Sequence, residues 1–430
     1  MRIFYSLSLL LLAVSVSVSP QSGEGAGPYT TARVSVAVPE NNEARTKLEE
    51  LFYAPAAALL TVQQRVLRQQ STGTRVLFQM QRQNGYLYYL FQNGEGSSIV
   101  SPGSYIIKRD LESGRFVQIK VFFRSDSGSF VRLFPEGNRT SMDVYLFELP
   151  VDRGVLLPLE FTSFLTEPFA KVIELSKSTV RWERLLYKRD SAVDELILDH
   201  VESIRRLLPA LKDRDDGAMD ADRRYVFIDS GISQGAAGGL NCSGFAKWVS
   251  DGFYYGLTGR YLDIEPLKEK HLELRGNRWS LRYEDERDPY FGLDWSRNLA
   301  AALWKALGYP EAGPEDFDVR NTEYLGYRED VGFRVEDLKL LLFLEASANP
   351  GHYYLGSVNR EYGKQPVLRQ HFHMVVLFPY FRVDGSFGVA VFDTNSESTL
   401  EGMVKRFPGA YVHLVRLPVG DSFVPPLPMY

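Results

Sequence analysis

A series of short segments rich in aromatic and β-branched residues constrains the fold of this chain more than any other feature. These segments include RVLFQMQ, YLYYLFQ, RFVQIKVFF and DVYLFEL. Turn dipeptides such as Asn84-Gly85 and Ser127-Gly128 separate them. Strands at a spacing of roughly ten residues with such turns are typical of antiparallel sheets. The sequence therefore predicts a β-rich accessory domain over 75–160, folded as a sandwich or a barrel.

The segment before this region, 21–74, carries a different pattern. It begins with small and polar residues, which indicate a linker. From Asn42 to Gln70 the spacing of apolar residues predicts a helix. Because proline cannot continue the helical hydrogen-bond ladder, we expect an interruption near Pro55.

The segment that follows the strands, 161–224, returns to a helical pattern. Val193, Ile197 and Val201 recur every four residues and form part of one apolar stripe. The charged run at 212–224 indicates a solvated domain boundary. We therefore expect 161–224 to be a helical connector between two domains.

The remaining residues, 225–430, mix helical and strand-like patterns. WSRNLAAALWKAL and VEDLKLLLFLEASA predict helices, whereas HYYLGSV, HFHMVVLFPYF, FGVAVFDT and AYVHLVRL predict strands. The sequence thus predicts an α+β fold, with a C-terminal domain over 225–430 that carries an insertion at about 255–348.

The N-terminal residues resemble a secretory signal peptide. Arg2 is followed by an apolar stretch from Ile3 to Val18 and then by small and polar residues. The stretch is short for a membrane span, and serines interrupt it. We therefore expect 1–20 to be a signal peptide of an exported protein, periplasmic or secreted, with no stable membrane insertion after its removal.

The charge of the chain limits the partners it can bind by electrostatics. The formal net charge is −5, and no basic run occurs in the sequence. Binding to nucleic acid or to anionic lipid depends on clustered Lys and Arg. We therefore expect no nucleic-acid partner.

Cys242 is the only cysteine in the 430 residues. It has no partner for an intrachain disulfide. In an oxidising compartment a lone thiol is exposed to oxidation and to mixed-disulfide formation. Cys242 is therefore either buried and inert or retained because its thiol is needed.

The residues around Cys242 favour a reactive thiol. The apolar residues after it share one helical face: Phe245, Trp248, Val249 and Phe253. This spacing places Cys242 in the first turn of a helix, where free N–H groups and the helix dipole stabilise a thiolate. The same N–H groups can bind an oxyanion. Gln234 and Asn241 are candidate side-chain donors to that oxyanion.

A nucleophilic thiol needs a base, and the base needs a group that orients it. His371 and His373 alternate along a predicted strand, so we expect them to share one face. His373 is the candidate base, with His371 as the alternative. Asp393 and Asn395, which follow the next predicted strand, are the candidate orienting residues.

The hairpin between these strands has two possible registers. An odd loop centred on Asp384 places Asn395 opposite His373, with Asp393 one step along the same face. A two-residue Asp384-Gly385 loop places Ser396 opposite His373 and turns both candidates away. The loop length therefore decides whether an orienting residue reaches His373.

Three segments resemble the NlpC/P60 cysteine peptidases. LNCSGFAKWV is similar to their nucleophile segment, NPGHYYLGSV to their first sheet strand, and HMVVLF to their histidine strand. The resemblance implies a papain-like fold for 225–430, with Cys242 as nucleophile, His373 as general base and Asn395 or Asp393 as orienter. It also implies a hydrolase that needs no cofactor and acts on peptidoglycan stem peptides.

Other functions remain open from the sequence. Transglutaminase-like proteins share the order helix-Cys, strand-His, strand-Asp, and VAVFDTNS would suit their aspartate. His371 and His373 with Asp393 form a possible zinc set for a metallohydrolase. A catalytically inactive wall-binding or scaffolding protein is a further alternative.

Overall fold

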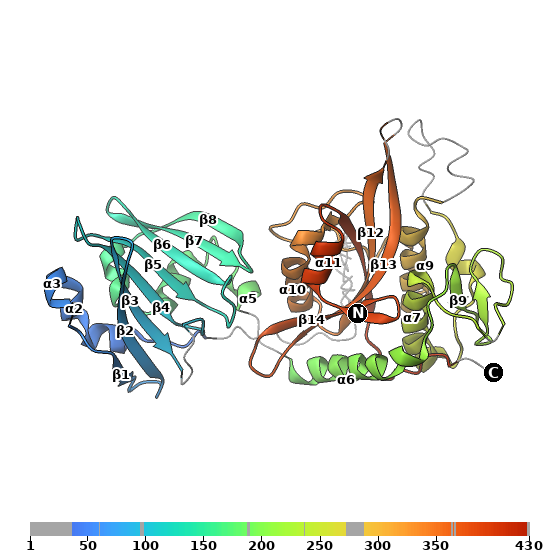
Figure 1. Cartoon of the computed structure of the whole chain (residues 1–430), viewed down its shortest axis with the longest axis horizontal. Coiled ribbons are helices and arrows are strands. Elements are labelled where there is room, and N and C mark those ends of the chain that lie inside the picture. Colours follow the sequence, from blue (N-terminus) through green and yellow to red (C-terminus); the bar gives the residue numbers. More distant parts are fainter. Residues whose placement is uncertain are drawn as a thin grey trace, which may run out of the picture.

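The computed structural model describes residues 37–59, 61–94, 99–186, 190–235, 237–271, 288–362, 364 and 367–427. The predicted signal peptide lies outside these residues. Within them the fold is mixed α+β and contains two large antiparallel sheets, drawn at the left and the right of Figure 1. None of the helices in these ranges has the length and apolarity required to cross a bilayer.

The N-terminal sheet is an antiparallel meander in which each strand pairs with its neighbours in sequence. Its strands are β1 (Arg65–Arg68), β2 (Arg75–Gln83), β3 (Tyr86–Asn93), β4 (Tyr105–Asp110), β5 (Phe116–Phe122), β6 (Phe130–Glu136), β7 (Arg139–Leu146) and β8 (Leu149–Leu157). The sheet is open, with β1 and β8 at its two edges. It is therefore neither the barrel nor the sandwich that the sequence predicted.

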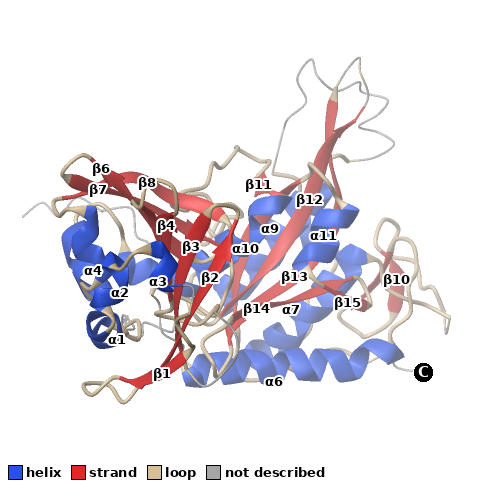
Figure 2. Cartoon of the chain, turned by 60° about the vertical axis from the view of Figure 1, so that its left-hand side comes forward, coloured by secondary structure: helices blue, strands red, loops and turns tan. Residues whose placement is uncertain are grey.

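Helices cover one face of this sheet, as Figure 2 shows for α1, α2 and α4. The helical segments are α1 (Asn42–Lys47), α2 (Glu49–Tyr53), α3 (Ala56–Leu59), η1 (Phe161–Leu165), α4 (Phe169–Ser176) and α5 (Trp182–Leu185). The prediction of a helix as far as Gln70 was wrong. Residues 65–68 form β1 instead, because they pair with β2 and complete the edge of the sheet.

The C-terminal sheet has the strand order β11-β16-β12-β13-β14-β15, which brings distant parts of the sequence together. Its strands are β11 (Phe333–Arg334), β12 (His352–Tyr362), β13 (Leu368–Phe381), β14 (Phe387–Asp393), β15 (Ser396–Ser398) and β16 (Tyr411–Pro418). Both faces are covered by helices, so this part of the chain is a three-layer structure.

The two helical layers differ in size. One apolar core contains α6 (Ser191–Leu207), α7 (Cys242–Thr258) and α9 (Phe291–Ala306), together with sheet residues such as Met374 and Val376. The core on the opposite face contains α10 (Leu338–Ala348) and α11 (Leu400–Arg406), together with Val375 and Leu377. Alternate residues of β13 therefore point into different cores, as the period of a strand requires.

Two sequence-based interpretations of this region need correction. The predicted solvated run at 212–224 contains β9 (Gly217–Met219), which is buried and pairs with β10 (Tyr225–Phe227). The predicted insertion at 255–348 supplies α9 and α10, which fill the two cores. Charge and aromatic content alone did not reveal these contacts, because the partner surfaces come from distant residues.

The two sheets are joined by an aromatic cluster. Phe343 of α10 is fully buried and lies 5.4 Å, centroid to centroid, from both Phe147 and Phe387. Arg124 adds a hydrogen bond to the Gly385 carbonyl at 3.0 Å. The predicted connector at 161–224 is divided between the units, since α4 and α5 pack with the N-terminal core and α6 with the C-terminal one.

Candidate active site

The start of α7 presents Cys242 at a helix N-terminus. The Asn241 side chain caps the helix by accepting a hydrogen bond from the Gly244 N–H at 2.8 Å. The first backbone bond within the helix runs from Phe245 to Asn241. The N–H groups of Cys242 and Ser243 are therefore left without an intrahelical acceptor, at the positive end of the dipole.

Glycine is needed at position 244 for this arrangement. A Cβ there would lie 1.9 Å from the carbonyl oxygen of Gly217 in β9. In the same turn, the indole N–H of Trp295 in α9 donates to the Ser243 carbonyl at 3.0 Å. β9 and α9 together fix the direction in which α7 delivers the thiol.

β13 supplies the groups that face the sulfur. Its pairing with β14 ends at Val376 and Phe392, so β14 does not cover the edge of β13 at residues 372–375. There the His373 side chain and the Met374 N–H both interact with Cys242 and lower the pKa of its thiol. The thiol is thus half-buried against an edge of the sheet rather than sealed in a core.

His373 connects Cys242 to a carboxylate. Its Nε2 lies 2.6 Å from Oδ1 of Asp393, at the end of β14. Since Nε2 is used in this way, Nδ1 is the ring nitrogen available to the thiol. Oδ2 of Asp393 accepts a hydrogen bond from Nη1 of Arg406 in α11. The four side chains form one continuous chain of contacts.

The charges in this chain of contacts shift its pKa values. Burial opposes ionisation of Cys242, but hydrogen bonding and charge from His373 outweigh it, and the pKa of the thiol falls below its usual value. Burial likewise opposes protonation of His373, yet the Asp393 hydrogen bond and Cys242 raise its pKa to about 9. The pKa of Asp393 is lowered despite burial, by His373 and Arg406. These directions favour a thiolate–imidazolium pair.

The hairpin has the first of the two registers considered from the sequence. Phe381 pairs with Phe387, which makes an odd loop centred on Asp384. Asp393 nevertheless contacts His373, and Asn395 does not. β14 ends at Asp393, and the chain then reverses so that Asp393 pairs with Ser396 of β15. Asn395 lies in this turn, and its side-chain amide has no partner among the described residues.

His371 does not share a face with His373, contrary to the prediction. His373 pairs with Val358 and His371 with Asn359, so a bulge at Phe372 separates the two histidines. Adjacent residues of β12 face opposite sides of the sheet. Accordingly, His371 is buried against α9 and bonds the Ser357 hydroxyl at 2.9 Å.

This separation removes the proposed zinc set. A site made from His371, His373 and Asp393 requires both imidazoles on one side of the strand. Among the residues that the structure describes, no group of three or more His, Cys, Asp or Glu side chains could hold a metal ion.

The two candidate oxyanion donors have different environments. Both ends of the Gln234 amide are bound to loop backbone, through the Val226 carbonyl at 2.6 Å and the Gly239 N–H at 2.9 Å. Gln234 therefore stabilises the glycine-rich loop, and it is not among the residues that line the cleft around Cys242. Asn241 uses Oδ1 for the helix cap and lines the cleft beside Cys242.

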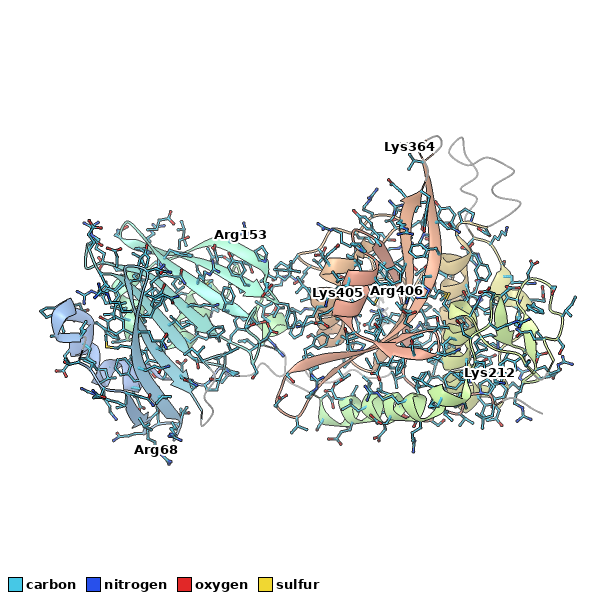
Figure 3. All side chains as sticks on the ribbon, in the orientation of Figure 1. Arg68, Arg153, Lys212, Lys364, Lys405 and Arg406 are labelled. Carbon is cyan, nitrogen blue, oxygen red and sulfur yellow. The ribbon has the colours of Figure 1, made fainter. Side chains whose placement is uncertain are left out.

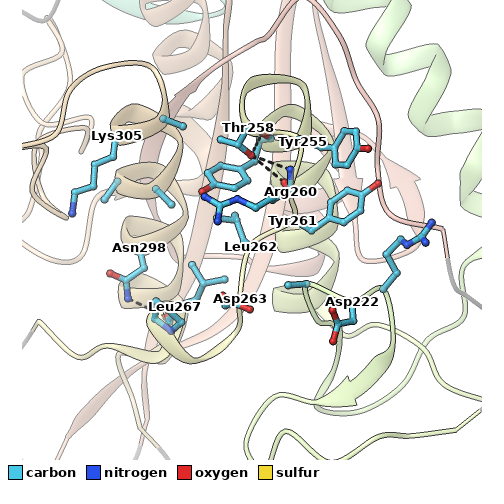
Figure 4. A pocket seen from close by; sticks show the side chains of 18 of the residues that line it. Asp222, Tyr255, Thr258, Arg260, Tyr261, Leu262, Asp263, Leu267, Asn298 and Lys305 are labelled. Atoms are coloured by element: carbon cyan, nitrogen blue, oxygen red, sulfur yellow. Dashed lines mark hydrogen bonds between the residues drawn. The ribbon is translucent and has the colours of Figure 1, made fainter.

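Cys242 and His373 line a cleft of about 690 Å³. Charged residues of both signs surround it: Asp215, Asp216, Asp229, Asp288, Lys268 and Lys270. A larger cavity of about 1040 Å³ lies at the opposite end of α7, around Tyr255, Tyr261 and Asn298 (Figure 4). Volume alone would select that second cavity, but it does not contain the Cys-His-Asp contacts.

Two parts of the site were missed at the level of sequence. Arg406 belongs to α11, a helix that was not predicted, although Thr399 caps it and Lys405 and Arg406 occupy its last turn. The second part is the Met374 N–H, a backbone group whose role no residue type in the sequence indicates. A search for helix caps after Asp393 would have found α11 and Arg406. Only the tertiary structure reveals the contribution of the Met374 N–H.

The comparisons with known proteins concern mainly the N-terminal unit. A family model described as a domain of unknown function (DUF8515) matches residues 34–184. No curated protein and no solved structure matches the chain. The chain is thus similar to that family over the eight-stranded sheet and its helices, and the Cys-His-Asp contacts lie outside the matched range.

Proposed function

We propose that this protein is a cysteine hydrolase of the papain-like class, with Cys242, His373 and Asp393 in its active site. One observation carries the proposal: His373 contacts both the thiol and a buried carboxylate. This is the nucleophile–base–orienter arrangement that thiol catalysis requires. The directions of the three pKa shifts support the same assignment.

The proposed reaction begins with proton transfer from Cys242 to His373. The thiolate attacks a peptide carbonyl carbon, and the C–N bond breaks as His373 returns the proton to the leaving amine. Water then attacks the thioester, with His373 accepting its proton, and releases the acid. The free N–H groups of Cys242 and Ser243 and the Asn241 amide are the proposed donors to the oxyanion.

Peptidoglycan stem peptides are the proposed substrates of an exported endopeptidase. The resemblance to NlpC/P60 peptidases and the predicted signal peptide support this choice, and the mixed charges of the cleft suit a substrate with free amines and carboxylates. Purified wall fragments incubated with the protein should yield cleaved peptides by mass spectrometry. Cys242→Ala should yield none, while Lys405→Ala should cleave normally. Identical products from wild type and Cys242→Ala would remove the proposal and favour the scaffolding alternative.

Acyl transfer to an amine is the second candidate function. The observation that favours it is an aspartate, Asp393, in the orienting position, as in transglutaminase-like proteins. The same thioester would then be attacked by an amine instead of water. Adding a labelled primary amine to the reaction distinguishes the two, because a transferase incorporates the label into the peptide and a hydrolase leaves free acid.

A further inference from the structure

We infer that Arg406 is a positioning residue that holds the Asp393 carboxylate in line with His373. The inference rests on the proposed function, since it assigns a role within the same site. Arg406 does not contact Cys242 or His373 directly in the described structure. Its effect on the thiol would pass through Asp393.

The two oxygens of Asp393 are divided between two partners. Oδ1 meets His373, and Oδ2 meets the Arg406 guanidinium. The Asp393 side chain is only 8% exposed, so water has little access to either oxygen. A carboxylate held at both oxygens cannot rotate without breaking a charge-assisted hydrogen bond. Arg406 thereby fixes the direction of the bond that His373 receives.

The position of Arg406 is itself set by local structure. The Thr399 hydroxyl caps α11 by accepting from the Gly402 N–H at 2.9 Å. The Arg406 guanidinium lies over the Phe407 ring at 4.9 Å, and that ring lies 5.4 Å from the His373 ring. The end of α11 therefore contacts both members of the His373–Asp393 pair.

Arg406 is also a cation near an imidazolium, so two effects compete. By fixing the Asp393 carboxylate, Arg406 stabilises the thiolate–imidazolium pair. Its positive charge also repels the imidazolium and so destabilises the pair. The Arg406 side chain is 56% exposed, so solvent and salt screen its charge. Its hydrogen bond to a buried oxygen is screened less. We therefore expect the positioning effect to prevail.

The alkylation rate of Cys242 as a function of pH measures this balance without any substrate. In Arg406→Ala, the rate with iodoacetamide at pH 6 should fall about three- to tenfold, and the acid limb of the profile should move to higher pH. Arg406→Lys, which keeps a charged donor, should recover part of the rate. Lys405→Ala, on the neighbouring residue of α11 labelled in Figure 3, is the matched control and should match wild type.

Each outcome bears on the inference. An acid limb that moves to lower pH in Arg406→Ala would mean that repulsion prevails, and an unchanged profile would mean that Arg406 is a surface residue. Either result overturns the positioning role. Thermal unfolding of each variant shows whether a change in rate merely reflects lost structure. Because alkylation needs no wall fragment, a failed digestion experiment and a failed positioning role give different results.

Discussion

The two sheets of this protein are both antiparallel, but they are assembled in different ways. In the N-terminal sheet every strand pairs with the next strand in sequence. In the C-terminal sheet β16 pairs with both β11 and β12, so residues 352–359 lie beside 411–418. A sheet of local hairpins can be predicted from alternation and turns, whereas a sheet of distant strands depends on packing.

The candidate active site lies on the C-terminal sheet and its helices. His373 and Asp393 lie on the two strands of the β13–β14 hairpin, and Cys242 reaches them from α7, far earlier in the sequence. The N-terminal sheet has an apolar core backed by helices and contains neither histidine nor cysteine within 34–184. The site therefore depends on the contact between this hairpin and a distant helix, and the following predictions test the contrast with the N-terminal sheet.

The largest effect on the reactivity of the thiol is expected from the loss of the base. His373→Ala should lower the rate of Cys242 alkylation at pH 7 by roughly 30- to 100-fold, because the thiol returns toward its ordinary pKa. Arg132→Ala, on the N-terminal sheet, should leave the rate unchanged. Timed mass spectrometry of the alkylated protein measures both. A thiol that reacts only after unfolding would contradict a reactive thiolate–imidazolium pair of Cys242 and His373.

Phe343→Ala tests the junction between the sheets. Removing this fully buried ring should cost about 3–5 kcal/mol, because it leaves a cavity among Phe147, Phe381 and Phe387. The single thermal transition expected for wild type should separate into two, one for each sheet. Phe343→Leu, which keeps most of the volume, should retain one transition. Two transitions in wild type would show that the aromatic cluster does not couple the units.

The pH dependence of stability tests the His373–Asp393 pair. Because the folded-state pKa of His373 is raised from 6.5 to about 9, its contribution is fully present below pH 6.5 and is lost as the pH rises through about 9. Wild type should therefore exceed Asp393→Asn by about 2 kcal/mol near pH 6 and by less at pH 9. Urea unfolding at several pH values measures the difference. A difference that grows with pH would contradict a protonated imidazole.

The smallest effect is expected for a surface ion pair between the units. Lys339 lies 3.5 Å from Asp126, and both side chains are partly exposed. Exposed pairs contribute little, so Lys339→Ala should lower the free energy of unfolding by less than about 0.5 kcal/mol. Urea unfolding in low and high salt checks this value. A larger loss would mean that charge, as well as the aromatic cluster, joins the two sheets.

The sequence by itself determined the parts that depend on neighbouring residues. Alternation and turns predicted an antiparallel N-terminal sheet, and helical spacing predicted α7 with Cys242 at its start. For the β13–β14 hairpin the sequence left two registers open, and the structure has the one with an odd loop. Each of these follows from backbone geometry over a few residues.

Only the tertiary structure decided which groups meet the thiol. The bulge at Phe372 separates His371 from His373, and the turn after β14 selects Asp393 over Asn395. Arg406 reaches Asp393 because α11 packs on the sheet face opposite α7. A bulge or a packed helix is stabilised by contacts between residues far apart in the chain, so its local sequence does not specify its position.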